Sequence, residues 1–273
     1  MLRLSGVGIS DVGRVRGHNE DSAFLNPCCM VVADGVGGAA AGEVASATAA
    51  YVVSASVMGQ PGVPPVDLLA SSMRLARQQL RLGVRQDPSR TGMATTLTAV
   101  VTDGERFALA HIGDSRGYVL RDGSLERVTT DHTVVQRLVD DGTLHPEDVS
   151  RHPWRHLVLR TLGGDDGEGR DDVGDVRSID LRAGDRVLLA SDGLTDLVSE
   201  RRLEGVLARH PDDVAIDLLV EAALGAGGHD NVTCLLATVV EGAAGSQDGQ
   251  LFGAVRDPRI VVDPAAVRLP HTA

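Results

Sequence analysis

The residues best suited to chemistry are four aspartates that stand at the edges of short apolar runs. They are Asp34, Asp114, Asp192 and Asp230. In the same order, the neighbouring apolar runs are Val31–Ala33, Ala110–Ile112, Leu188–Ala190 and Val232–Val240. Taken singly, each is typical of a turn, because the chain has seven Asp-Gly dipeptides. Repetition of one arrangement at distant places favours a shared site instead, since strand ends can converge at one edge of a layered sheet.

Carboxylates that converge in this way indicate divalent metal ions. Close carboxylates repel and raise one another's pKa unless cations lie between them, and hard oxygen ligands select Mg²⁺ or Mn²⁺. A pair of such ions activates water against a phosphate ester without a side-chain nucleophile. Glu20 and Asp21 add two acids, and Gly35 leaves room for a backbone carbonyl to approach a metal. Arg16 is suited to grip a phosphate, although read alone it is typical of a solvated surface residue.

These residues require a scaffold of strands with inserted helices. Apolar spacing of three and four predicts helices over 40–58, 66–82 and 212–224. The strands are expected at Met30–Ala33, Thr95–Val101, Phe107–Ile112, Gly117–Leu120, Val187–Ala190 and Val232–Val240, with a hairpin turn at Asp122-Gly123. The elements do not alternate strictly, which favours an α+β fold with mostly antiparallel sheets.

Composition narrows the class of protein. The chain has 38 acidic residues against 26 basic ones, for a net charge of −12, which argues against a nucleic-acid partner. Cys28, Cys29 and Cys234 form neither a disulfide framework nor a zinc motif, so a reducing cytoplasm is expected. The uncharged stretch from Val44 to Val66 is broken by Gly and Pro and is too short for a membrane span. The N-terminal residues lack the apolar run of a signal peptide.

Together these segments resemble the bacterial form of the PPM family of metal-dependent Ser/Thr protein phosphatases. The matching motifs occur in the family's order over roughly residues 5–240. They are Ser10–Arg16, Asn19–Ser22, Ala33–Gly38, Ala41–Ser46, Gly92–Leu97, His111–Arg116, Asp131–Thr133, Arg160–Gly163, Leu188–Asp196 and Asp230–Thr233.

The resemblance implies a fold and a set of residue roles. The fold is a central antiparallel β-sandwich flanked on both faces by helices, a four-layer αββα arrangement with the metals at one end. Two core ions, Mn²⁺ or Mg²⁺, and a third are implied. The implied roles are Asp34 as bridge, Gly35 through its carbonyl, Asp192 and Asp230 on one ion, Glu20 and Asp21 supporting the other, Asp114 with Asp192 on the third, Arg16 on the phosphate and Asn231 ordering the site.

Two positions depart from the family pattern. Val36 stands where many eukaryotic members have His, so the leaving oxygen must receive its proton elsewhere, from metal-bound water or from His132, His152 or His229, each of which is more typical of a structural residue. Ala94 replaces a usual Gly without an expected loss of activity. Residues 131–170 correspond to the variable flap beside the active site, where loops govern substrate access.

The expected function is hydrolysis of phosphoserine and phosphothreonine in proteins by direct attack of a metal-activated water. A pseudophosphatase acting as a binding or scaffold module is the main alternative, and a metal-dependent nuclease is a second. Phosphorylated proteins, including Ser/Thr kinases and their substrates, are the expected partners of a monomeric enzyme. Residues 1–241 are expected to form the catalytic domain and 242–273 a flexible tail, in which the short apolar run Leu251–Val255 is a candidate for docking.

Overall fold

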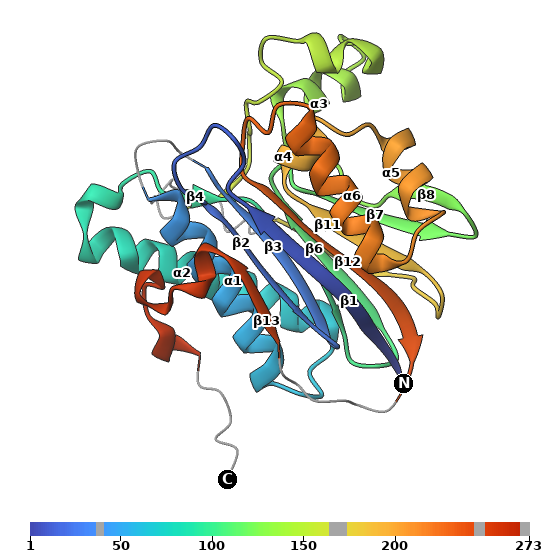
Figure 1. The fold of residues 1–273 in the computed structure, drawn as a ribbon. Helices are drawn as coiled ribbons and strands as arrows, with labels where there is room; N and C mark the ends of the chain where they lie inside the picture. Colours follow the sequence, from blue (N-terminus) through green and yellow to red (C-terminus); the bar gives the residue numbers. More distant parts are fainter. Residues whose placement is uncertain (37–40, 164–173, 243–248, 268–273) are drawn as a thin grey trace.

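The computed structural model describes residues 1–36, 41–163, 174–242 and 249–267. Within these residues the chain forms two antiparallel sheets stacked face to face, with helices on the outer face of each (Figure 1). The predicted four-layer αββα fold is therefore confirmed. No helix in the described part of the chain has both the length and the apolar character needed to cross a membrane.

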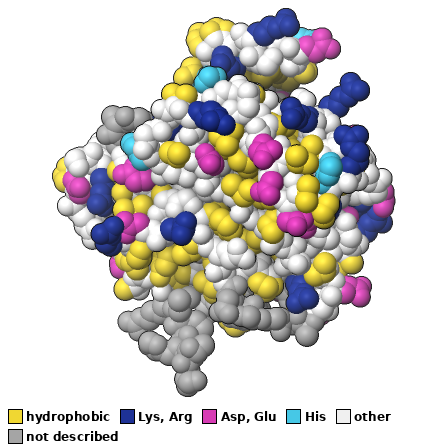
Figure 2. Space-filling view, viewed as in Figure 1, with side chains coloured by type: hydrophobic (Ala, Val, Ile, Leu, Met, Phe, Trp, Pro, Cys, Tyr) yellow, Lys and Arg dark blue, Asp and Glu magenta, His cyan; other side chains and the backbone are white. Residues whose placement is uncertain are grey.

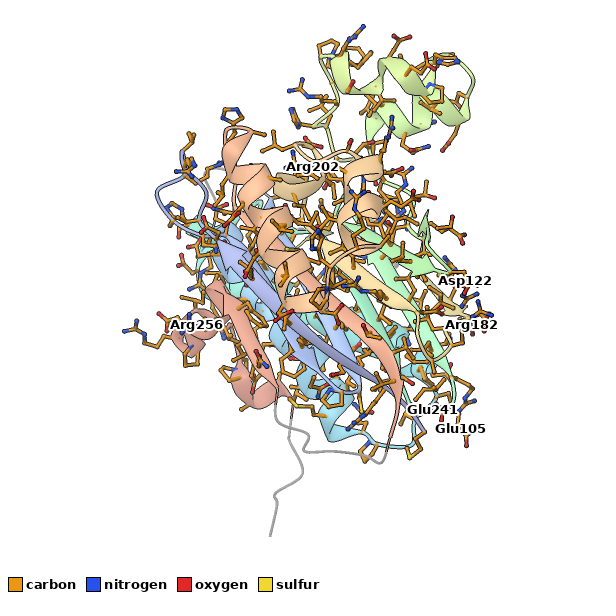
Figure 3. The ribbon with its side chains drawn as sticks, turned by 45° about the vertical axis from the view of Figure 1, so that its right-hand side comes forward. Glu105, Asp122, Arg182, Arg202, Glu241 and Arg256 are labelled. Atoms are coloured by element: carbon orange, nitrogen blue, oxygen red, sulfur yellow. The ribbon has the colours of Figure 1, made fainter. Side chains whose placement is uncertain are left out.

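The first sheet has five strands among the described residues. Their spatial order is β1 (Leu2–Asp11), β12 (Val232–Glu241), β11 (Arg186–Ala190), β7 (Arg116–Arg121) and β8 (Ser124–Arg127). The β7–β8 turn is the predicted Asp122-Gly123 hairpin. Both residues have positive φ, 52° and 84°, as a two-residue turn of this kind requires. Asp122 also pairs with Arg182 at this end of the sheet (Figure 3).

The second sheet has eight strands among the described residues. Six run in the order β10 (Asp175–Ile179), β6 (Phe107–Ile112), β5 (Leu97–Thr102), β3 (Cys29–Val36), β2 (Asp21–Asn26) and β13 (Gln250–Gly253), and β3 also pairs with β4 (Ala94–Thr95), which pairs with β9 (Leu162–Gly163). The single strand expected at Thr95–Val101 is interrupted at Thr96. That residue leaves the ladder because its backbone N–H and hydroxyl both bond the main chain of Asp34.

Helices cover the outer faces of the two sheets. The second sheet carries α1 (Gly42–Gly59) and α2 (Pro65–Gln86), and the first carries α4 (Asp192–Thr195), α5 (Glu200–Leu207) and α6 (Asp212–Gly225). The three predicted helices correspond to α1, α2 and α6. A further helix, α3 (Val134–Asp140), belongs to the flap, which projects beyond one end of the sandwich (Figure 1). Residues 164–170 of the predicted flap lie outside the described residues.

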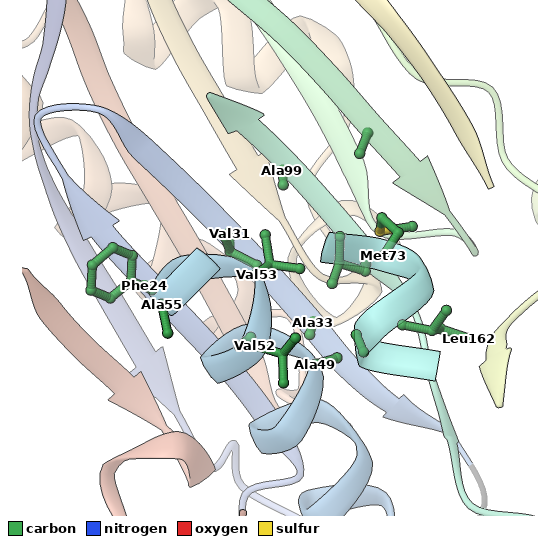
Figure 4. Packing of buried hydrophobic residues seen from close by; sticks show 14 of the residues in the cluster. Phe24, Val31, Ala33, Ala49, Val52, Val53, Ala55, Met73, Ala99 and Leu162 are labelled. Atoms are coloured by element: carbon green, nitrogen blue, oxygen red, sulfur yellow. The ribbon is translucent and has the colours of Figure 1, made fainter. Parts of the chain in front are cut away.

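The core contains few aromatic side chains and is built from Val, Leu and Ala. Helix α1 is buried on nearly every side, because it lies between β2 and β3, α2 and the C-terminal segment. Figure 4 shows Val31 and Ala33 of β3 beside Ala49, Val52 and Val53 of α1. Small side chains let this helix approach the sheet closely, and an apolar surface all round is what a buried helix requires. A separate cluster fills the space between the two sheets.

The C-terminal residues differ from the flexible tail expected for 242–273. Strand β13 pairs with β2, and three short 3₁₀ segments follow it, η3 (Ala254–Arg256), η4 (Pro258–Ile260) and η5 (Pro264–Ala266). Val255, Val261 and Val267 are buried against the helical layer, while Arg256 projects outward (Figure 3). Residues 249–267 therefore belong to the folded domain, because three apolar side chains spaced six apart find a surface there. Residues 243–248 and 268–273 of the expected tail lie outside the described residues.

Candidate active site

Two of the predicted acids are neighbours on adjacent strands of the second sheet. Asp21 of β2 lies directly opposite Asp34 of β3 in the antiparallel register. The main chain of Asp34 is held from the other side, where Thr96 Oγ1 accepts its N–H at 3.0 Å and the Thr95 hydroxyl donates to its carbonyl at 2.8 Å. The interruption of the strand at Thr96 thus fixes the position of the Asp34 backbone.

Two further acids come from the first sheet. Asp192 begins α4 directly after β11, and Asp230 lies two residues before β12. Ser191 joins these strand ends to the second sheet, since its hydroxyl donates to Asp21 Oδ2 at 2.8 Å and its oxygen accepts the Thr233 N–H at 3.0 Å. The predicted convergence of strand ends therefore occurs at one end of the sandwich, with acids contributed by both sheets.

Asp114 lies in the turn that links the two sheets, between β6 and β7. Its pKa is raised to about 6, first by burial and then by the negative charges of Asp131 and Asp196. Gly113 precedes it with φ 108°, a conformation that glycine adopts without strain. This turn brings Asp114 into the same cleft as Asp34 and Asp192.

The cleft has a volume of about 570 Å³ and is lined mainly by polar and charged residues. Its walls include all but one of the predicted site residues, namely Arg16, Glu20, Asp34, Gly35, Asp114, Asp192, Asp230 and Asn231. Asp21 is the exception: it is 1% exposed and lies behind this lining. Its charge still affects the cleft, because it raises the pKa of the neighbouring Asp34.

The carboxylates shift one another's pKa strongly. Burial raises the pKa of Asp34 and of Asp192 well above the usual range, and charges on neighbouring aspartates raise both further. The pKa of Asp21 rises to about 6, mainly through burial, against hydrogen bonds from Thr233 and Ser191 that lower it. Cations placed among these groups would remove the repulsion, so the electrostatics of the cleft fit the divalent ions implied by the sequence.

Gly35 has no room for a side chain. A Cβ there would lie 2.4 Å from the carbonyl oxygen of Gly42, and a Cβ on Gly42 would lie 2.6 Å from Glu20 Oε2. The start of α1 therefore packs directly against the end of β3. This close approach places Glu20 beside Gly35 and leaves the Gly35 backbone exposed to the cleft.

Asn231 organises the wall formed by the β1–β2 connection. Its Oδ1 accepts the Glu20 N–H at 2.7 Å, and its Nδ2 donates to the carbonyls of Val12 and His18 at 2.9 and 3.0 Å. One buried side chain thus holds three points of the loop that carries Arg16 and Glu20. The geometry agrees with the ordering role expected for Asn231.

Arg16 lies at the edge of the cleft with about half of its side chain exposed. Its Nη2 donates to Asp230 Oδ2 at 2.6 Å, and this bond raises the pKa of the guanidinium. The contact uses one of the five N–H donors of arginine. The other N–H groups of Arg16 remain available, and the Arg16 side chain lines the cleft together with Glu20 and Asp34.

The histidines considered as proton donors separate into two groups. His132 is largely buried and contacts Asp175 and Arg160, and its ring centroid lies 4.9 Å from that of the tilted His111 ring. His152 packs against Trp154 away from the cleft lining. His229 lines the cleft, as does Val36, the residue that departs from the family pattern.

His156 and Asp196 are cleft residues to which the sequence assigned no role, although His156 falls in the predicted flap and Asp196 ends the matched motif Leu188–Asp196. His156 Nδ1 lies 3.4 Å from Asp196 Oδ2, and both residues have ligand atoms close to that of Asp192. Asp196 caps the C-terminal end of α4 one helical turn after Asp192, a spacing that places the two acids on the same side. That spacing was the available signal for Asp196. For His156 the signal was only its place in the flap predicted beside the active site, and this does not tell which flap side chain reaches the cleft.

Known proteins are similar to this chain in sequence and in fold. The family model described as Protein phosphatase 2C matches residues 18–212. The curated Serine/threonine protein phosphatase PstP of Mycobacterium tuberculosis (strain ATCC 25618 / H37Rv) is 40% identical over 264 residues, covering 97% of this chain and 49% of PstP. The Serine/threonine phosphatase stp of Listeria welshimeri is 34% identical over 237 residues, covering 83% of this chain and 92% of that protein.

A solved structure agrees with these matches. The crystal structure of the catalytic domain of PstP in complex with two manganese ions has a TM-score of 0.80 and 40% identity, and the match covers 88% of this chain and all of that one. This chain and that structure share the αββα sandwich. The chain belongs to the protein phosphatase 2C family, which confirms the resemblance to bacterial PPM phosphatases. It spans about half the length of the PstP sequence it matches.

Proposed function

We propose that this chain is a metal-dependent phosphatase that hydrolyses phosphoserine and phosphothreonine in proteins. The observation that carries the proposal is the convergence of carboxylates from both sheets on one cleft that also holds Arg16. The related PstP catalytic domain was crystallised with two manganese ions, and the curated relatives carry the name serine/threonine phosphatase.

The proposed ion-binding groups follow from this arrangement. Asp34, Asp192, Asp230 and the Gly35 carbonyl would hold the core ions with Glu20 and Asp21 in support, and Asp114 with Asp192 would hold a third. When bound, Mn²⁺ or Mg²⁺ supplies an activated water and neutralises phosphoryl charge. Two observations support this assignment: the pKa values of Asp34 and Asp192 are raised, and Gly35 has no room for a side chain.

The chain's own residues would bind and orient the phosphate ester. Arg16 would donate its uncommitted N–H groups to phosphoryl oxygens while Asp230 holds its guanidinium at the cleft edge. Asn231 keeps that loop in place through its three hydrogen bonds. His156 and His229 are the histidines that line the cleft, so they are the protein groups placed to protonate a leaving oxygen.

A pseudophosphatase is the second candidate. A binding module of this fold would be free to lose one or more acids, yet every predicted acidic residue is present at the same end of the sandwich. The completeness of the set favours the enzyme. Phosphorylated proteins, including Ser/Thr kinases and their targets, are the proposed partners, and the free thiols of Cys28, Cys29 and Cys234 suit the reducing cytoplasm proposed as the location.

Phosphate release from a phosphothreonine peptide with Mn²⁺ tests the proposal. We expect Asp192→Asn to lower kcat by about a hundredfold or more, because loss of metal-based charge stabilisation costs several kcal/mol. Asp180→Asn is the matched control, since Asp180 is almost fully exposed in the connection between β10 and β11, outside the cleft lining. Activity that persists in EDTA and in Asp192→Asn would reject the proposal in favour of a non-enzymatic role.

A further inference from the structure

Exposed apolar side chains gather around the cleft. Eight large hydrophobic residues are strongly exposed in the described part of the chain. Five of them lie in the two segments that border the cleft, and they are Val12 and Val15 on the β1–β2 connection and Trp154, Leu157 and Leu159 on the flap. We call these five residues the cleft rim. Exposed apolar groups that cluster in this way mark interaction surfaces.

The flap side of the rim is continuous with the cleft. Arg155, His156 and Val158 line the cleft, whereas their neighbours Trp154 and Leu157 are 54% and 51% exposed. The same short segment therefore presents one set of side chains to the metal centre and another to solvent. Apolar and charged side chains on the flap are visible at the top of Figure 2.

The exposure on the flap comes from a fixed backbone. Val158 forms a bridge with Thr133, and the flanking hydrogen bonds join Leu157 O to the Val134 N–H at 2.9 Å and the Leu159 N–H to His132 O at 2.7 Å. The Trp154 ring contacts His152 edge-on at 5.6 Å. A surface held in this way loses little conformational entropy when it binds.

The opposite side of the rim is also held in place. Asn231 Nδ2 donates to the Val12 carbonyl at 2.9 Å, and the Arg14 N–H donates to Gly228 O at 2.8 Å. Val15 is 66% exposed and directly precedes Arg16. Apolar groups therefore stand on both sides of the position where a phosphate would meet Arg16.

We propose that the cleft rim docks an extended phosphorylated segment of a partner protein with apolar residues on both sides of the phosphoresidue. The inference rests on the proposed function and specifies its substrate class. The two halves of the rim are separated by the cleft that holds Arg16 and would hold the proposed ions, so an occupant of both halves must cross that cleft and can place its phosphate there. An extended peptide does both, whereas a flat lipid surface would rest on the rim without entering the cleft.

Steady-state kinetics on paired substrates test this docking. Two phosphothreonine peptides differ only in flanking residues, Leu and Val in one and Ser in the other, and para-nitrophenyl phosphate serves as a substrate without flanks. We expect the wild-type KM to favour the apolar-flanked peptide by roughly tenfold, as burial of a half-exposed leucine-sized side chain predicts. The double variant Trp154→Ser/Leu157→Ser should lose this preference and keep its kcat/KM for para-nitrophenyl phosphate.

Val214→Ser is the matched control, because Val214 is 41% exposed on α6 outside the rim. It should behave as wild type on all three substrates. Equal KM values for the two peptides in the wild type, or a preference that survives in the double variant, would overturn the docking proposal. Absence of turnover on every substrate would reject the proposed function. In that case a measurement of peptide binding tests the docking proposal independently.

Fluorescence provides that binding measurement, because Trp154 is the single tryptophan of the chain. The probe is the apolar-flanked peptide with a non-hydrolysable phosphonate in place of the phosphate, added to wild-type protein with Mn²⁺. We expect the tryptophan emission to shift to shorter wavelength and to saturate as the probe is added. The dissociation constant should be at least about tenfold higher for the Ser-flanked probe. An unchanged spectrum would contradict docking. Self-association in sedimentation that the double variant abolishes would instead assign the rim to a second copy of the chain.

Discussion

At the scale of single residues, the buried carboxyl groups make the metal-free protein sensitive to pH. The pKa of Asp21 and of Asp114 rises from 3.8 to about 6 in the folded chain, mainly through burial. The folded state therefore holds protons that the unfolded state has released. Stability from these two groups is present below about pH 4 and is lost as pH rises from about 4 to about 6.

Thermal unfolding in EDTA tests whether the stability of the metal-free protein falls as pH rises. We expect the Asp21→Asn variant to lose less stability than wild type between pH 4.5 and pH 7, because it no longer has that ionisation. Added Mn²⁺ should raise the wild-type Tm more at pH 7 than at pH 4.5, since ions and protons compete for the same oxygens. Asp180→Asn should follow wild type throughout. A metal effect independent of pH would contradict the assigned pKa shifts.

The sequence predicted the main acids because each one stands beside an apolar run that forms a strand. Asp34, Asp192 and Asp230 all lie at the cleft end of the sandwich, as expected. The contact between Arg16 and Asp230 was not predicted, because it depends on a loop fixed by Asn231 from the far end of the chain. His156 was expected in the flap beside the active site, but its place in the cleft lining was not predicted, since it depends on the path of the flap.

At the scale of elements, the strands hardest to predict were those with low intrinsic strand propensity. Their residues are determined by packing on a neighbouring strand. Strand β1 contains Gly6 and Gly8, which weaken local strand propensity. A Cβ on Gly6 would lie 2.2 Å from the Leu236 carbonyl oxygen, so close packing on β12 requires glycine there. Strand β13 is short and follows a Gly-rich stretch, and its structure depends on the edge offered by β2.

The C-terminal segment should contribute measurably to stability. Val255 is 2% exposed, and its N–H donates to Ser22 Oγ at 3.1 Å. We expect Val255→Asp to lower the free energy of unfolding by roughly 3 kcal/mol or more, because it buries an unpaired charge. Leu251→Asp, at a position 41% exposed on the same segment, should cost less than about 1 kcal/mol. Denaturant titration measures both, and equal effects would show that the segment is not docked in solution.

At the scale of the whole molecule, the acidic centre joins the two sheets. Asp21 and Asp34 belong to the second sheet, Asp192 and Asp230 to the ends of strands in the first, and the Ser191–Asp21 hydrogen bond already crosses between them. Ions bound among these groups would therefore hold both sheets at once. Their binding energy would stabilise the sandwich as a unit.

Hydrogen exchange with and without Mn²⁺ tests this coupling. We expect metal to slow amide exchange at the cleft ends of β2 and β3 and also of β11 and β12, with little change at the distant β7–β8 hairpin. The Asp192→Asn variant should lose the protection in both sheets together. Protection confined to one sheet would show that the ions do not connect the two layers.

The docked C-terminal strand also bears on solubility. All six residues of β2 are buried, and β13 pairs with four of them through Gly253 opposite Ser22 to Gln250 opposite Leu25. Without β13, β2 would present a row of unpaired backbone groups, which is the template on which strands of separate molecules pair and aggregate. The terminal segment thus replaces a six-residue sheet edge with a four-residue one, so a shortened chain ending at residue 241 would favour intermolecular strand pairing.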